Sequence, residues 1–298
     1  MYPELAYPLR KEIIPIWLAA FLAAVVPILV ILAAQIRVRS FWDVNNGVLG
    51  LLYSLITAAV FQVWIKWLIG GLRPHFLAVC QPDVRLATES RSQYDAAGFR
   101  QLYYTKEICT GERAEINDSL ESFPSGHSTA AFAGFVYLFL YLNAKLKVFA
   151  NYHAAMWKLV VVYAPLLAAV LIAGALTIDE FHHWWDLLAG ALIGSAMAFS
   201  AYRMCYAAVW DWRFNHIPMH RGQPFAYAGA GAGIDLEDAV WTHRAGWGVA
   251  SSVAAHHHGG GHHRGAPGGA MAGAGAGGMT QSRKPVGGGV PARGDDIV

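Results

Sequence analysis

The sequence has few charged residues. Only 14% of its 298 residues are Asp, Glu, Lys or Arg, whereas about 25% is typical of soluble domains. Hydrophobic residues make up 55% of the chain, and the mean hydropathy is +0.34. This composition excludes an ordinary soluble domain and indicates a membrane protein.

Basic patches and paired cysteines are also scarce. The net charge is only +2, and no basic stripe or row of interleaved aromatic residues is present, so nucleic-acid binding has no support. The three cysteines, Cys80, Cys109 and Cys205, match no metal-binding spacing such as CxxC. They exclude a framework of several disulfides and leave a single bridge open.

Long apolar runs are abundant. Five stretches approach the roughly 20 apolar residues that cross a hydrocarbon core, near 14–34, 47–70, 127–144, 157–178 and 186–208. The first is too long for the apolar region of a secretory signal. We therefore predict an all-α, integral membrane helical bundle with about five transmembrane helices. Gly190 and Gly194 have a spacing that favours close helix packing in the last span.

The C-terminal part differs in composition. Residues 1–225 form the predicted membrane domain, and 226–298 are rich in Gly, Ala, Pro and His. Such a segment buries too little apolar surface to offset its ordering entropy, so we predict a disordered tail. We interpret its histidines as a low-complexity feature with adventitious metal affinity, namely His256, His257, His258, His262 and His263.

Short loops predict the orientation. The loops 35–46 and 145–158 and the exit from the last span have an excess of basic residues, which places them in the cytosol together with the tail. The loop 75–121 holds eight acidic and five basic residues and falls on the lumenal or extracellular face. That face also holds Cys80, Cys109 and the glycosylation triplet that begins at Asn117.

Three polar clusters come together on the lumenal face in this topology. In the first, Lys66 lies inside an apolar run and Arg73 follows seven residues later, about two helical turns, so both are predicted to point the same way. Pro74 is expected to end the helix and leave the guanidinium free to bind two phosphate oxygens. A lysine that extends to the membrane interface is the alternative for Lys66.

The second cluster begins a helix. Pro124 breaks the chain, Ser125 supplies a hydroxyl, Gly126 allows close backbone approach, and the N–H groups of the helix start attract anions. An ordinary N-cap is the alternative. His127, in the first turn, is well placed to give a proton to a leaving oxygen.

The third cluster is His182 with Asp186 four residues later. On a helix the carboxylate would hold the imidazole in one tautomer, as a nitrogen nucleophile requires. His183 is the competitor, but it is rotated by about 100° from that face.

Together these segments resemble the three signature motifs of the type 2 phosphatidic acid phosphatases, the PAP2 or lipid phosphate phosphatase family. The resemblance implies a metal-independent, cofactor-free hydrolase that acts on phosphatidic acid, diacylglycerol pyrophosphate or related lipid phosphates. It assigns nucleophilic attack to His182, orientation to Asp186 and proton donation to His127. It also implies that the phosphoryl group is bound by Lys66, Arg73, Ser125 and the Gly126 backbone.

Two features depart from the family. Its third motif opens with Ser-Arg, where this chain has Ala175 and Leu176, so one cation is missing. The family usually has six spans, and the sixth would precede Met1, which leaves open a shortened sequence or a five-span variant. The missing cation leaves a non-catalytic lipid-phosphate binder as one alternative. A lipid phosphotransferase is another, because its first half-reaction is identical, and a vanadate haloperoxidase has less support because those enzymes are typically soluble.

Overall fold

The computed structural model describes residues 3–83, 85 and 106–222, all within the first of two compact units, Met1–Gly259. Five long helices dominate the described part: α1 (Ile16–Val38), α2 (Phe41–Ile69), α6 (Gly126–Leu146), α7 (Met156–Ile178) and α8 (Trp184–Cys205). All five are long and apolar enough to cross a membrane. The prediction of an all-helical membrane bundle is confirmed. The predicted tail, 226–298, lies outside the described residues.

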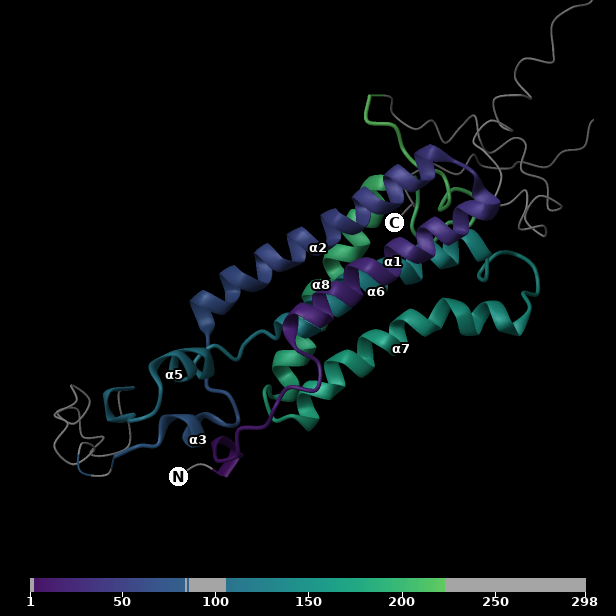
Figure 1. Ribbon diagram of the computed structural model, residues 1–298. Coiled ribbons are helices and arrows are strands. Elements are labelled where there is room, and N and C mark those ends of the chain that lie inside the picture. The colour runs from purple at the N-terminus through teal and green to yellow at the C-terminus, as the bar shows by residue number, and fades with distance from the viewer. Residues whose placement is uncertain (1–2, 84, 86–105, 223–298) are drawn as a thin grey trace, which may run out of the picture. The chain divides into compact units, whose positions relative to one another are not determined.

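Short elements join the long helices on one side. They are α3 (Phe76–Cys80), α5 (Arg113–Ser119) and two 3-10 turns, Pro3–Leu5 and Lys106–Ile108. Figure 1 shows α3 and α5 beyond the C-terminal end of α2, close to the described N-terminal residues. The described residues contain isolated β-bridges and no strand.

Helix α6 is the centre of the bundle. In its apolar window 83% of the residues are buried, whereas the other four long helices have 22–33%. It packs against α1, α2, α7 and α8. A central helix faces protein on all sides, so it tolerates polar residues that lipid would not, and this allows its first turn to belong to a site.

Helices α6 and α8 approach closely at two glycines. A Cβ added at Gly190 would lie 2.7 Å from the Ser125 carbonyl oxygen, and one at Gly194 would lie 2.5 Å from that of Thr129. Both distances are shorter than a Cβ can approach a backbone oxygen, and the backbone cannot easily move away, so only glycine fits at these positions. The packing interpretation of these glycines is confirmed.

Helix α2 begins six residues earlier than predicted. Ser40 caps it by accepting a hydrogen bond from the Asp43 N–H at 3.4 Å. The sequence interpretation assigned polar Asp43 to a loop, but tertiary contacts bury it. Its carboxylate accepts hydrogen bonds from Lys145 (2.5 Å), Tyr141 (2.7 Å), Gln35 (2.9 Å) and Tyr206 (3.1 Å). We call these five residues the distal cluster, since they lie at the opposite end of α2 from Lys66.

Candidate active site

Arg73 lies after a turn that follows α2, whereas the sequence predicts that it lies on the helix itself. Helix α2 ends at Ile69, and Gly70 and Gly71 follow with φ of 61° and 115°. Those angles favour glycine, and a Cβ at Gly70 would also lie 3.0 Å from the Leu120 carbonyl oxygen. The prediction that Pro74 ends the helix and that Lys66 and Arg73 share one helical face is therefore wrong. The two glycines reverse the chain, and the Arg73 N–H donates to the Ser119 carbonyl at 2.9 Å.

Both predicted phosphate-binding cations have acidic neighbours. Arg73 Nη2 donates to Asp118 Oδ1 at 2.8 Å, and Lys66 Nζ lies 3.8 Å from Glu121 Oε2. The Lys66 side chain is 20% exposed and that of Arg73 is 7% exposed. Burial lowers the pKa of Arg73, and the Asp118 carboxylate opposes that shift. Each cation thus has a carboxylate partner in this structure, and an incoming anion would have to compete with these two carboxylates.

The start of α6 is tied to the start of α8. Ser125 caps α6, and its own N–H donates to the Asp186 carbonyl at 3.1 Å. Its hydroxyl accepts from the Ser128 N–H only at 3.5 Å, which is a weak capping bond. A Cβ at Gly126 would make ordinary contacts at 3.6 Å with Gln62 and Ile16, so packing does not require glycine there. The phosphate-binding roles of Ser125 and Gly126 stay predictions.

His182 lies just before α8 instead of on it. The helix starts at Trp184, and the His183 N–H donates to Asp186 Oδ2 at 3.1 Å, which caps the first turn. His182 Nδ1 is 3.7 Å from the same Asp186 oxygen, within ion-pair range but beyond a hydrogen bond. Asp186 approaches His182 because it caps its own helix. The competitor, His183, instead stacks on Trp185 with ring centroids 4.4 Å apart.

Charged groups from three segments surround the buried His182 ring. Burial lowers the pKa of His182 below its ordinary value, the Asp186 carboxylate opposes this, and the charges of Arg73 and Lys66 lower it further. His182 also interacts electrostatically with His127. The structure thus brings together the predicted residues of all three clusters. A neutral imidazole is the form that a nucleophile needs.

The N-terminal segment covers this region. Residues 7–14, which we call the strap, are held by three contacts: the Tyr7 N–H to the Pro74 carbonyl (3.2 Å), Arg10 to the Ile178 carbonyl (2.9 Å), and the Ile13 N–H to Asp179 (2.7 Å). The backbone of Ile14 contacts the His127 ring. A hollow of about 610 Å³ lies between the strap and Phe181, the residue before His182.

Unpaired polar atoms gather in the site. Three buried side-chain atoms of the described residues have no hydrogen-bond partner: Arg73 Nε, His127 Nε2 and Asp186 Oδ1. Buried polar atoms are nearly always paired, so a cluster of exceptions needs an explanation. A ligand that accepts a hydrogen bond would satisfy the Arg73 donor, and a ligand oxygen could bond to the His127 nitrogen.

Leu176 is fully buried near the end of α7. Its carbonyl accepts a hydrogen bond from the Phe181 N–H at 3.2 Å, so its backbone helps to fix the turn that leads to His182. The side chain supplies no charge.

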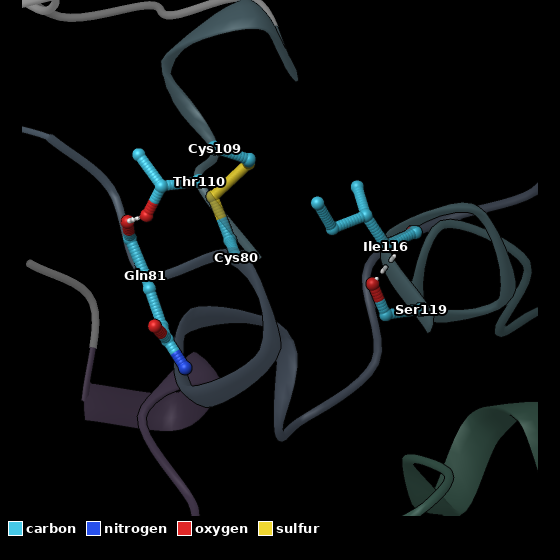
Figure 2. The surroundings of a disulfide bond; sticks show 6 residues. All are labelled: Cys80, Gln81, Cys109, Thr110, Ile116 and Ser119. Atoms are coloured by element: carbon cyan, nitrogen blue, oxygen red, sulfur yellow. Dashed lines mark hydrogen bonds between the residues drawn. A yellow bond between two sulfur atoms is a disulfide. The ribbon is translucent and has the colours of Figure 1, made fainter. Parts of the chain in front are cut away.

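The segment between α2 and α6 contains a disulfide. Cys80 and Cys109 are bonded, as the sequence left open, and the Thr110 hydroxyl donates to the neighbouring Gln81 carbonyl at 2.7 Å (Figure 2). In the predicted glycosylation triplet Asn117 is exposed, but Ser119 is buried in α5 and its hydroxyl donates to the Ile116 carbonyl at 2.7 Å. Asp118 is hydrogen-bonded to Arg73. Two of the three residues of this triplet are therefore held by contacts of the fold, which makes it a poor glycosylation acceptor in the folded chain.

Sequence reasoning missed several residues of the site. In the sequence Asp118 and Glu121 are two of the eight acidic residues of the loop 75–121, and no motif includes Ser122 or the strap. Glu121 and Ser122 precede the second motif by only two or three residues. That closeness in sequence is the one feature that could have indicated that they belong to the site. Within the described residues no group of three or more His, Cys, Asp or Glu side chains could hold a metal ion. That the reaction needs no metal stays a prediction.

The fold and these motifs define a class of membrane phosphatase-like proteins. The PAP2 superfamily model matches residues 47–210, more than half of the chain, and the chain belongs to this superfamily. Among its relatives is lipid phosphate phosphatase 1 of Arabidopsis thaliana, 37% identical over 69% of this chain and 59% of that protein.

Two further relatives are similar over comparable lengths. Lipid phosphate phosphatase 2 of Arabidopsis thaliana is 34% identical over 71% of this chain and 68% of that protein. Diacylglycerol pyrophosphate phosphatase 1 of Saccharomyces cerevisiae is 32% identical over 67% of this chain and 61% of that protein. The match thus spans about three fifths to two thirds of these relatives. No solved structure matches the chain.

Proposed function

We propose that this protein is a metal-independent lipid phosphate phosphatase that hydrolyses phosphatidic acid, diacylglycerol pyrophosphate or a related lipid phosphate through a phosphohistidine intermediate. The observation that carries the proposal is the buried His182 ring, which adjoins the Asp186 carboxylate and is under the influence of Arg73, Lys66 and His127. The names of the relatives agree with this substrate class.

The reaction has two steps. In the first, His182 Nε2 attacks phosphorus, the bond between phosphorus and the leaving oxygen breaks, and His127 gives its proton to that oxygen. In the second, water attacks the phosphohistidine while His127 takes a proton from it, and inorganic phosphate and free His182 result. Lys66, Arg73, Ser125 and the Gly126 backbone would bind the phosphoryl oxygens, whose charge they stabilise in the transition state.

The membrane setting supports a lipid substrate. His127 and His182 lie at the ends of apolar helices, so a headgroup could enter the site while its acyl chains remain in hydrocarbon. We further propose that this end faces the lumen or the extracellular space and that the tail is cytosolic. The Cys80–Cys109 disulfide supports this orientation, because disulfides persist in oxidising compartments.

Two alternatives share the same site. In a phosphotransferase an alcohol would replace water in the second step, and a new phospholipid would appear in place of inorganic phosphate. In a non-catalytic binder, which the uncharged Leu176 favours, the protein would bind phosphatidic acid without releasing phosphate.

The test is phosphate release from phosphatidic acid by purified protein with magnesium chelated. We expect wild type to release phosphate and to form a labelled phosphoenzyme that is stable in base and hydrolyses in acid, as a phosphorus–nitrogen bond to histidine does. His182→Ala should abolish both signals because the attacking nitrogen is lost. His183→Asn is the matched control, since it removes the neighbouring imidazole and keeps a good helix cap. Two outcomes would contradict the proposal. One is that His183→Asn loses activity while His182→Ala keeps it, and the other is that wild type binds phosphatidic acid but releases no phosphate.

A further inference from the structure

The Ser122 hydroxyl lies within reach of both the His182 ring and the Asp186 carboxylate. Its hydroxyl oxygen is 2.6 Å from Asp186 Oδ2 and 3.4 Å from His182 Nδ1, whereas those two atoms are 3.7 Å apart. The direct contact is within ion-pair range but longer than a hydrogen bond, whereas the serine oxygen makes a short hydrogen bond to Asp186 and a weak one to His182. None of the three sequence motifs includes this residue.

The backbone fixes Ser122 in this position. Its N–H donates to the Gly71 carbonyl at 3.0 Å, and the next N–H, of Phe123, donates to the Gly70 carbonyl at 3.0 Å. The serine is 2% exposed, so solvent does not compete for its hydroxyl. The turn that delivers Arg73 to the site therefore also holds Ser122.

The chemistry of the groups sets the direction of the bonds. A carboxylate only accepts hydrogen bonds, so the single hydroxyl proton of Ser122 goes to Asp186 Oδ2. The serine oxygen then faces His182 Nδ1 with its lone pairs, and the favourable partner for it is a protonated Nδ1. In that tautomer Nε2 is unprotonated and free to attack phosphorus.

We propose that Ser122 is a positioning residue that connects Asp186 to His182 and holds the imidazole in the tautomer with the proton on Nδ1. This inference rests on the proposed function, because it concerns the nucleophile of that reaction. Ser122 does not touch the phosphorus. It acts through His182, by a chain of two hydrogen bonds that runs beside the longer ion pair between histidine and aspartate.

The charged and titratable groups facing His182 are Lys66 of α2, Arg73 of the following turn, His127 of α6 and Asp186 of α8. Without the Ser122 hydroxyl, Asp186 loses a hydrogen-bond donor and interacts more strongly with a protonated His182. That interaction favours the charged imidazole and raises its pKa. Attack requires the neutral ring, so the acid limb of activity should move to higher pH in Ser122→Ala.

The first experiment compares wild type with Ser122→Ala and Ser122→Cys, using phosphate release across pH and the amount of phosphoenzyme after an alkaline quench. We expect a roughly 10- to 100-fold lower kcat for the alanine variant, as for loss of one hydrogen bond to a charged group, with little change in KM. Ser122→Cys keeps a side chain of similar size with a weaker hydrogen-bond donor, so its kcat should lie between those of wild type and Ser122→Ala. If Ser122→Ala does not fold, the comparison of Ser122→Cys with wild type decides the question. Ser119→Ala is the matched control, because it removes another buried hydroxyl of the same segment, bonded only to the Ile116 carbonyl.

A double-mutant cycle tests the connection. In an Asp186→Asn background, Ser122→Ala should cost less than about threefold, since the two residues act on His182 as one unit. An equal loss in both backgrounds, or an unchanged kcat and acid limb in Ser122→Ala, would overturn the inference and leave the proposed phosphatase function standing.

A second readout does not depend on turnover. The His182 ring can be titrated by NMR of histidine-labelled protein, with its signal assigned by its loss in His182→Ala. We expect a higher His182 pKa in Ser122→Ala than in wild type. If wild type releases no phosphate, the proposed function fails, and this titration still decides whether Ser122 positions the ring. An equal pKa in both proteins would refute the positioning role.

Discussion

At the scale of single residues, position 176 separates this chain from the family pattern. A fully buried leucine stands where the resembling family has an arginine. Loss of one transition-state donor costs about 10²–10³ in rate. Leu176→Arg should therefore raise kcat for phosphate release, if the guanidinium reaches the phosphoryl group as in the family.

Leu176→Met is the control for that substitution, since it changes shape in the core without adding charge. Thermal unfolding should accompany both assays, because a buried arginine also costs stability. A well-folded Leu176→Arg variant with no gain over Leu176→Met would show that another cation already serves this role.

At the scale of elements, the distal cluster connects α1, α2, α6 and the exit of α8. Asp43 and Lys145 are each 2% exposed, and the carboxylate accepts four side-chain hydrogen bonds from the cluster. Removing one partner of a buried ion pair leaves an uncompensated charge and costs about 3–5 kcal/mol.

Asp43→Asn should therefore strongly lower the free energy of unfolding in detergent. Unfolding can be monitored by circular dichroism or by thermal aggregation. Asp211→Asn is the matched control, because it breaks the pair with Arg213, whose side chain is 51% exposed. Exposed pairs contribute under about 1 kcal/mol. Similar losses in both variants would mean that the distal cluster has no special role in stability.

At the scale of the whole molecule, the proposed orientation has a direct test. In sealed vesicles of known sidedness, an impermeant maleimide should label Cys80 and Cys109 only after reduction and only from the lumenal or extracellular side. Cys205, which is buried, serves as the internal reference. Labelling of the pair from the cytosolic side would reverse the orientation and with it the proposed location of the site.

The fold was largely predictable because a bilayer restricts the choices. Long apolar runs can satisfy their backbone only as helices, so composition alone gave five spans close to α1, α2, α6, α7 and α8. The start of α2 was misplaced, since Asp43 is polar in sequence but buried by partners that are about 100 residues away, such as Lys145.

The sequence alone determined the membrane class and the three polar clusters that contain Lys66, His127 and His182, because local composition records long apolar runs and the chemical groups beside them. Only the tertiary structure decided that Gly70 and Gly71 turn the chain before Arg73, that Asp118 pairs with Arg73, and that Ser122 contacts both His182 and Asp186. These contacts join residues far apart in the chain. Their geometry depends on how α2, α6 and α8 pack, and no local pattern records it.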